Sequence, residues 1–278
     1  MTDTYRHIIP CLLALLLVSC ASEEEWPQAE SGDGEGSFSL SLAAGRLNAE
    51  VETRADGDSW RTLTADEAAA YQVTLSQKGS NRWGPKAFLD VTDRDRTQPA
   101  RSGYVVSAES CSEEQAESTN GGWGQPHYRG QSEPFEVKNG ENTQVEVKCR
   151  MLNAGFCVVF DQSFTERFPT TYAVTTDDAR SLQFNAGNAA VFSGNTITDG
   201  QIAYYNMDAD GQRTVSLIVT GADEWDRVRI EKVIRMESGK FYRLFVRVGD
   251  EGGQVSLDIT IDDEFTNSDE DIIIDESP

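Results

Sequence analysis

Few residues in this sequence could carry out bond-making chemistry, and the cysteines are the first to consider. The chain of 278 residues contains five of them. Cys11 and Cys20 lie in or next to an apolar N-terminal segment, which leaves Cys111, Cys149 and Cys157 in the body of the chain. Neither a Cys-x-x-Cys pair nor a zinc-ligand spacing occurs among them. A Cys111–Cys149 bridge is one interpretation, and small buried hydrophobes on strands are the other, which we favour.

His127 is the only histidine beyond the N-terminal segment, so a nucleophile–histidine–acid triad would have to use it. It lies in a loop-like segment over residues 124–128 and in no catalytic motif. The 47 Asp and Glu residues could supply the carboxylate pair of a glycoside hydrolase, but no pair is singled out. We therefore expect no catalytic residue, no cofactor and no enzymatic activity.

Two acid-rich segments have the residue types that bind calcium. Residues 206–211 have oxygen-bearing side chains at alternate positions and glycine at the sixth, as in the first half of an EF-hand loop. The position of the bidentate glutamate holds Leu217, and no helical pattern flanks the segment. Asp90, Asp93 and Asp95 form the other group. A hairpin turn and a polar loop explain these segments better, so we expect no metal site.

The charge of the chain limits its partners further. It has 24 Lys and Arg residues against 47 Asp and Glu residues, a formal net charge of −23. Phosphate backbones require clustered cations, so nucleic-acid binding is excluded. The 12 Phe, 8 Tyr and 5 Trp residues argue against simple disorder.

The N-terminus has the composition of a signal peptide. Its apolar run over residues 8–18 is shorter than the roughly 20 residues that cross a bilayer. The run ends in Leu17-Val18-Ser19-Cys20, which resembles the bacterial lipobox. This resemblance implies that residues 1–19 are removed and that Cys20 is acylated; an ordinary secretory signal is the alternative. No later segment is apolar enough for a transmembrane helix, so we expect a soluble body held by acyl chains.

Residues 20–36 are rich in glycine and acid and predict a flexible tether. The run Glu23-Glu24-Glu25 resembles the signal that exports Bacteroidetes lipoproteins to the outer face of the outer membrane. A solvated linker is the alternative. We favour export, which predicts a cell-surface protein anchored in the outer membrane through Cys20.

From residue 37 the sequence predicts a succession of short strands. Apolar and polar residues alternate in residues 37–42 and in many later segments, as in half-buried antiparallel strands. The Asn-Gly turn in residues 138–141 and the glycine-rich segment 250–253 predict two hairpins. Helical signals are confined to a capping box at Thr64 and a short turn over residues 163–168.

This pattern predicts an all-β protein. Many short strands with little helix are typical of β-sandwiches. The chain beyond the tether is too long for one small sandwich, so we expect two tandem antiparallel β-sandwich domains. The N-terminal sandwich would cover residues 37–150 and the C-terminal sandwich residues 151–278.

Several segments together resemble a known family. They are residues 36–42, 51–55, 103–108, 126–130, 149–154 and 239–242. In order and spacing they are similar to the Bacteroidales surface lipoprotein family with the domain of unknown function numbered 4493, which is fimbrillin-like in style. Arg101-Ser102-Gly103 departs from the Pro-Gly or Ala-Gly turn of the family. The resemblance implies the architecture and a surface location without an established activity; fimbrillin-like relatives are pilus or adhesion subunits.

Aromatic side chains in loops are the candidates for ligand contact. Trp60, Trp83 and Trp123 lie in polar or glycine-rich segments, and His127 and Tyr128 follow the third. Exposed rings stack on sugars or bind protein partners. The alternative is that these rings cover the open end of a sandwich.

Two features would serve assembly of several copies. Ile272, Ile273 and Ile274 lie between acids near the C-terminus. They predict either a last strand of the second domain or a segment that completes a neighbouring subunit's sheet by strand addition. Arg54 follows the first predicted strand, where fimbrillin-type subunits are sometimes cut, and the resemblance makes it a candidate maturation site at which cleavage is not required.

Two classes of function agree with these features. The first is a non-catalytic, lipid-anchored cell-surface protein that acts in adhesion or as a fimbria-like assembly component. The alternative is a glycan-binding accessory lipoprotein of a nutrient-capture system. The expected partners are the outer membrane, a protein or glycan ligand, and further copies of the chain.

Overall fold

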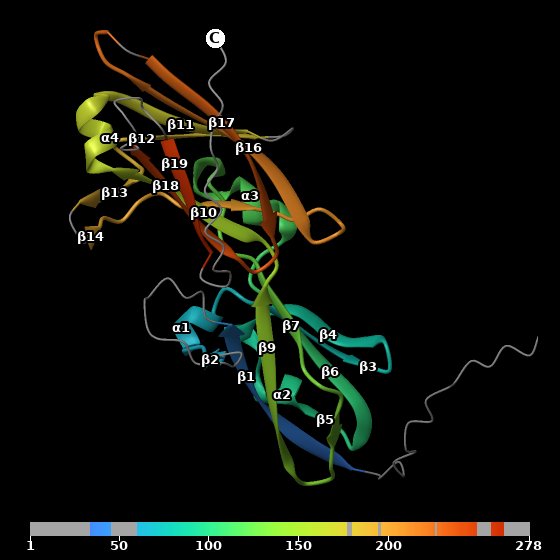
Figure 1. Ribbon diagram of the computed structural model, residues 1–278. Coiled ribbons are helices and arrows are strands. Elements are labelled where there is room, and N and C mark those ends of the chain that lie inside the picture. The colour runs from blue at the N-terminus through green and yellow to red at the C-terminus, as the bar shows by residue number, and fades with distance from the viewer. Residues whose placement is uncertain are drawn as a thin grey trace, which may run out of the picture.

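The computed structural model describes residues 34–45, 60–176, 180–193, 196–225, 227–248 and 257–263. Strands dominate these ranges, so the predicted all-β class is confirmed. The strands form two units that follow one another along the chain (Figure 1). We name residues 34–151 the first unit and residues 154–263 the second unit, and we propose that they are two domains.

The strands of the first unit form one continuous sheet of nine strands. Its order is β2-β1-β9-β7-β6-β3-β4, with β5 paired to β1 and β8 paired to β6. The strands are β1 (Glu35–Gly45), β2 (Trp60–Thr62), β3 (Gln72–Gln77), β4 (Ser80–Ala87), β5 (Thr97–Pro99), β6 (Arg101–Glu109), β7 (Tyr128–Gln131), β8 (Phe135–Val137) and β9 (Asn142–Met151).

This sheet folds over on itself around an apolar core. The ring of Phe135 lies 5.4 Å from that of Phe38 on β1 and 5.8 Å from that of Tyr104 on β6, measured between ring centroids. β1 and β6 are separated by β9 and β7, so a flat sheet would hold them about 14 Å apart. The alternating apolar residues of β1, β3, β6 and β9 therefore meet in one cluster.

The Asn-Gly turn of residues 138–141 is present, but the hairpin expected around it is not. The Glu141 amide donates to the Lys138 carbonyl (3.2 Å), and Gly140 has a φ of 70°. In the described ranges β8 pairs with β6, whereas β9 pairs with β1 and β7. The hairpin prediction was wrong because a turn motif fixes where the chain reverses, and the burial of distant residues chooses the strand partner.

The second unit contains two sheets that face each other. One has the order β14-β13-β10-β18-β19, with β15 paired to β10, and the other has the order β12-β11-β16-β17. The strands are β10 (Ala154–Asp161), β11 (Thr170–Thr176), β12 (Ser181–Asn185), β13 (Ala190–Ser193), β14 (Thr196–Ile197), β15 (Ala203–Tyr205), β16 (Gln212–Ala222), β17 (Arg227–Glu237), β18 (Phe241–Val248) and β19 (Leu257–Asp263).

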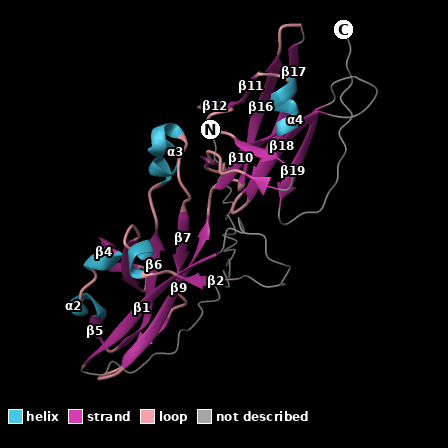
Figure 2. Cartoon of the chain, turned by 90° about the vertical axis from the view of Figure 1, so that its left-hand side faces the viewer, coloured by secondary structure: helices cyan, strands magenta, loops and turns pink. Residues whose placement is uncertain are grey.

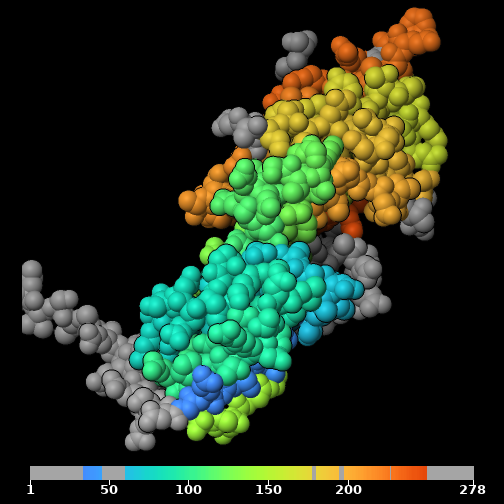
Figure 3. All heavy atoms as spheres, turned by 180° about the vertical axis from the view of Figure 1, so that it is seen from behind, coloured from blue at the N-terminus to red at the C-terminus, as the bar shows by residue number. Residues whose placement is uncertain are grey.

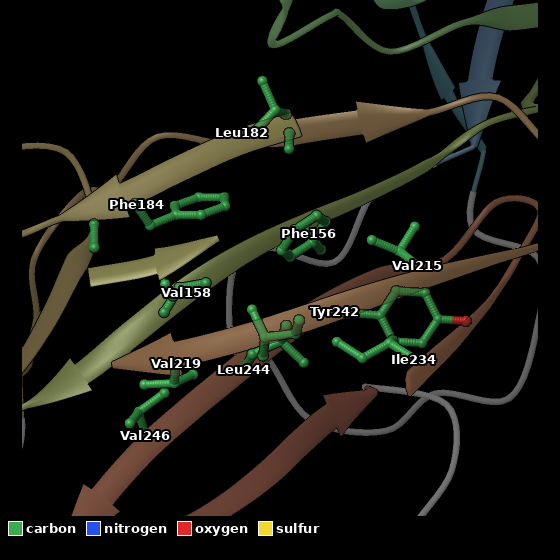
Figure 4. Close-up of a cluster of buried hydrophobic side chains, with 14 of the residues drawn as sticks. Phe156, Val158, Leu182, Phe184, Val215, Val219, Ile234, Tyr242, Leu244 and Val246 are labelled. Carbon is green, nitrogen blue, oxygen red and sulfur yellow. The ribbon is translucent and has the colours of Figure 1, made fainter. Parts of the chain in front are cut away.

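The core of the second unit lies between its two sheets. Phe156 on β10 and Leu244 on β18 meet Phe184 on β12 and Val215 on β16 in one buried cluster (Figure 4). β18 and β19 form the second predicted hairpin, with Val248 opposite Leu257. That prediction is confirmed because consecutive alternating strands pair most readily.

The expectation of purely antiparallel sheets needs a correction. β1 runs parallel to β9, and β10 runs parallel to both β13 and β18. Alternation of apolar residues identifies a strand and its buried face, but it carries no information on the direction of a partner far away in the sequence. Parallel pairs join such distant strands, because they need long crossover connections.

Helices are short and few in the described ranges. They are α1 (Ala65–Ala68), α2 (Asp93–Arg96), α3 (Glu113–Gly122), α4 (Gln162–Arg167) and the 3-10 turn η1 (Phe88–Asp90). The capping box predicted at Thr64 is confirmed: its hydroxyl accepts from the Glu67 amide, and the Glu67 carboxylate accepts from the Thr64 amide. None of these helices has the length and apolar content that a bilayer crossing requires.

Candidate functional site

His127 and Tyr128 both serve the packing of the first unit. His127 is buried, its amide donates to Asn153 Oδ1 (3.0 Å), and its Nε2 lies 2.8 Å from Glu109 Oε1. The ring of Tyr128 packs against the core of the first unit, and burial raises its pKa to about 12. Among the described residues no serine, threonine or cysteine bonds to the His127 ring, so the arrangement offers no triad.

Trp60 and Trp83 lie on the two strands that end the strand order of the first sheet, β2 and β4. The Trp60 ring is half-buried, with Lys148 Nζ and the Arg150 guanidinium each 5.6 Å from its centroid. The Trp83 indole N–H donates to the Asp95 carbonyl (2.9 Å). The tryptophans that the sequence grouped as one ligand-contact region are therefore separated, and each already has a structural partner.

Trp123 lies where the two units meet. Residues 110–127 leave the first sheet after β6, form α3 and return to β7 (Figure 2). The Trp123 ring packs edge-on against Phe184 of the second core, with centroids 4.9 Å apart. Its carbonyl accepts from the Tyr204 amide (2.8 Å). The green surface of this excursion covers the second unit in Figure 3.

Further polar contacts hold the excursion in place, and together with Trp123 they define the joint. Arg180 donates to the carbonyls of Glu117 (3.2 Å) and Gly122 (2.7 Å), and its guanidinium lies 4.0 Å from the centroid of the Tyr205 ring. The Asn206 amide donates to Glu117 Oε1 (2.7 Å). α3 was not predicted from the sequence, although Ser112 and Gln115 form a capping box that marks its start.

Asn153 completes the joint. Its side chain is buried, donates to the Gln125 carbonyl (2.8 Å) and accepts from His127, while its carbonyl accepts from the Gly239 amide (3.0 Å). One residue between β9 and β10 therefore bonds to the excursion and to the turn between β17 and β18.

An open groove of about 430 Å³ runs beside the joint. It is lined by Asn120, Gly124, Gly187, Asn188, Asp199, Gly200, Gln201, Ile202 and Tyr204. Several of its amides already bond within the chain: Asn188 donates to the Gln183 carbonyl (3.1 Å), and Asn120 donates to the Gly124 carbonyl (2.7 Å). The lining of the groove is about as apolar as it is polar, and a hydroxyl-rich ligand could bind there through Asp199.

Cys111, Cys149 and Cys157 are buried, and neither Cys111 nor Cys149 forms a disulfide. The Cys111–Cys149 bridge is therefore not formed, because both thiols are accommodated as small apolar groups. Burial raises the pKa of Cys149 to about 12, which leaves the thiol protonated and unreactive near neutral pH.

Neither acid-rich segment gathers its carboxylates around an open position. Asp95 pairs with Lys86 and accepts from the Thr92 amide (2.9 Å), and these contacts lower its pKa to about 2. Asp208 pairs with Arg213 (3.1 Å) in the turn before β16. Within the described ranges no group of three or more His, Cys, Asp or Glu residues could hold a metal ion.

The most exposed tryptophan of the described ranges is one that the sequence analysis did not consider. Trp225 is 88% exposed in the turn between β16 and β17. Its amide donates to Asp223 Oδ1 (2.7 Å), and Asp223 also pairs with Arg167 at the end of α4. Asp223 thus holds the start of the turn, while the Trp225 ring faces water. The acids around Trp225 in the sequence were the available signal, because a buried ring rarely has charged neighbours on both sides.

Aliphatic residues also lie on the outer face of this sheet, separated from the turn by Thr220 and Arg229. Val174 lies opposite Ile218, and Ser216 lies opposite Val233, which is 64% exposed. We name Val174, Ile218 and Val233 the outer stripe. Together with Trp225 it offers a ring and aliphatic groups for contact with a partner, but no group for acid–base or nucleophilic catalysis.

Three of the sequence-predicted features lie outside the described residues. They are the lipidation site Cys20, the maturation site Arg54 and the apolar triplet over residues 272–274.

Comparison with known proteins identifies one family. The model of the domain of unknown function DUF4493 matches residues 34–276, which is most of the chain. None of the curated proteins matches it.

Some solved structures are similar in outline. A candidate cell adhesion protein from Bacteroides eggerthii is 14% identical, with 84% of this chain and 97% of that chain covered and a TM-score of 0.42. A candidate cell adhesion protein from Bacteroides uniformis is 12% identical, with 83% and 99% covered and a TM-score of 0.43. A fimbrial assembly protein from Parabacteroides distasonis is 14% identical, with 82% and 98% covered and a TM-score of 0.42. These values are too low to transfer a function.

Proposed function

The chain belongs to the DUF4493 family, and we propose that it is a non-catalytic, lipid-anchored cell-surface protein that acts in adhesion or as a fimbria-like assembly component. The observation that carries the proposal is Trp225, 88% exposed on a fixed turn. The β16–β17 hairpin lies at the opposite end of the molecule from the start of β1 (Figures 1 and 3). A lipid anchor before β1 would therefore hold this hairpin outward, where it meets a partner.

The contact role is tested in cells that display the full chain. Trp225→Ala removes the exposed ring, and we expect adhesion to immobilised mucin or fibronectin to fall at least about fivefold, because central aromatic residues dominate binding energy. Leu89→Ala is the matched control, since Leu89 is 60% exposed on the first unit. Equal adhesion of the Trp225→Ala cells and the wild type would contradict the proposal.

Anchoring is tested separately through the lipobox resemblance. Cys20→Ala should abolish incorporation of labelled palmitate and release the protein from the membrane fraction. Protease treatment of intact cells should digest the wild-type protein if it is displayed outside. A wild-type product that stays free of membranes would refute the anchor.

Assembly by strand addition is the finer part of this proposal. Cleavage at Arg54 would open an acceptor groove, and donation of the residue 268–278 segment to a neighbouring cleaved copy would then make the protein a polymerising subunit; the uncleaved chain keeps this segment. Mass spectrometry of surface-purified protein decides on maturation: an N-terminus only at Cys20 removes it. Loss of self-association after deletion of residues 268–278 would support donation.

The second candidate function is a glycan-binding accessory lipoprotein, and the groove beside the joint favours it. A glycan array probed with the full chain should then give binding that Asp199→Ala abolishes and Trp225→Ala preserves. The opposite pattern assigns glycan contact to the hairpin instead.

A further inference from the structure

β17 is an edge strand with an open side. In the described ranges it pairs only with β16, over all 11 of its residues. In an antiparallel ladder about half of the N–H and C=O groups point away from the partner strand. Such a long free edge invites another strand unless charges select what can pair there.

The charges on β17 are mainly basic, with four Arg or Lys residues against Glu231 and Glu237, and they therefore favour an acidic partner strand. Arg227, Arg229 and Arg235 are exposed on its outer face, and no carboxylate of the described residues pairs with Arg227 or Arg235. Lys232 lies at an inward position of the same strand. In an antiparallel pair of two β17 strands centred on Lys232, Arg227 would face Glu237, but Arg229 would face Arg235 and Lys232 would face its own copy; an acidic strand avoids these like-charge contacts.

The core beneath this edge is incompletely covered. Ile234 and Met236 are buried on the inner face of β17, but Val228 and Ile230 are only half-buried where they pack against the core. A further strand along this edge would cover them with its own inward side chains.

We propose that the open edge of β17 binds residues 269–275 of the same chain as an added antiparallel strand. Residues 264–278 contain six acids and no Lys or Arg. With the period of a strand, Asp269, Asp271, Ile273 and Asp275 share one face, and Glu270, Ile272 and Ile274 share the other. When Ile272 and Ile274 lie opposite Ile230 and Val228 and cover them, Asp275 lies opposite Arg227, and Asp271 lies opposite Glu231 and diagonal to Arg229. On the inner face Glu270 then lies opposite Lys232.

The position of β19 allows this segment to reach the edge. Its last residue, Asp263, lies opposite Tyr242. The Tyr242 hydroxyl accepts from the amide of Glu237, the last residue of β17 (2.9 Å). Residues 264–268 span up to about 16 Å when extended, and facing sheets lie about 10 Å apart. The segment then runs from Glu237 toward Arg227, antiparallel to β17.

Hydrogen exchange of the full chain tests this proposal. We expect the amides of residues 270–275 to exchange at least about tenfold more slowly than in an isolated peptide of residues 264–278, and salt to reduce the protection. Equal exchange rates in the chain and the peptide would overturn it.

Two pairs of variants separate binding from folding. Arg227→Glu with Arg229→Glu should abolish the protection, whereas Arg82→Glu with Arg129→Glu makes the same charge change on exposed residues of the first unit and should leave it unchanged. Ile272→Ser with Ile274→Ser, outside the described fold, should abolish it while the protection of β16 persists. Protection that survives both changes would contradict the β17 edge as its site.

Dilution identifies whose segment is bound. Protection that stays constant over about a hundredfold dilution of a monomer supports the chain's own segment. Protection that falls with dilution assigns the segment to a second copy and overturns the proposal as stated. These exchange measurements do not depend on the proposed adhesive role of Trp225. If Trp225 proves to have no role in adhesion, the expected protection of residues 270–275 is the same.

Discussion

The joint and the β16–β17 hairpin each present a tryptophan from a polar loop, and the structure gives the two rings opposite roles. Trp123 packs edge-on against Phe184 and bonds through its backbone to Tyr204. Trp225 is 88% exposed on a turn that Asp223 fixes. The comparison teaches that an aromatic residue in a loop joins a core where a second unit faces it and remains available for a partner where none does.

The largest loss of stability should follow from removal of the Trp123 side chain from the joint. Trp123→Ala removes the ring from the second core, and we expect a loss of about 3 kcal/mol in the free energy of unfolding, at the low end for such truncations because the ring is half-buried. Urea denaturation measures it. Trp60→Ala on the first sheet is the control, and a loss below about 1 kcal/mol at Trp123 would show that the joint is not a packed interface.

Asn153 tests the polar half of the same joint. Asn153→Ala leaves the His127 amide and the Gln125 carbonyl without their partner, and we expect a cost of about 2 kcal/mol in unfolding free energy. Asn81→Ala, at an exposed position on β4, should cost little. Comparable losses for both variants would mean that water replaces Asn153 freely.

The Asp95–Lys86 pair at the edge of the first sheet provides a pH test away from both tryptophans. The pKa of Asp95 is about 2, below its ordinary value near 4, so its ionised form stabilises the fold above pH 4 and this contribution is lost as the pH falls toward 2. Asp95→Asn should cost less than about 1 kcal/mol at pH 7, because Lys86 is partly exposed.

The measurement for Asp95 is chemical denaturation at several pH values. The difference between wild type and Asp95→Asn should shrink steadily between pH 4 and pH 2. A difference that stays constant over this interval would assign the effect to packing instead of charge.

The smallest change in stability is expected at the hairpin. Trp225→Ala should alter the unfolding free energy by no more than about 0.5 kcal/mol, because the ring is already exposed in the folded state and buries little apolar surface on folding. Thermal unfolding alongside Trp123→Ala makes the comparison direct. A loss at Trp225 as large as at Trp123 would show that the ring packs in solution and would remove it as a contact residue.

The sequence predicted parts of this molecule that depend on neighbours along the chain. The alternation around Phe38, the capping box at Thr64 and the β18–β19 hairpin are all present. The candidate ligand-contact residues were harder to interpret, because Trp60, Trp83 and Trp123 have similar polar surroundings in the sequence and different partners in the fold.

Local periodicity alone determined the all-β class. A strand with one solvent-exposed face has alternating apolar and polar residues, whichever strand it pairs with. The tertiary structure alone decided that β1 and β10 take parallel partners, that α3 crosses to the second unit and that Trp225 remains in water. These outcomes depend on contacts between residues far apart in the sequence, which for β1 and β9 are more than a hundred residues apart. A local sequence pattern contains no information about such a distant partner.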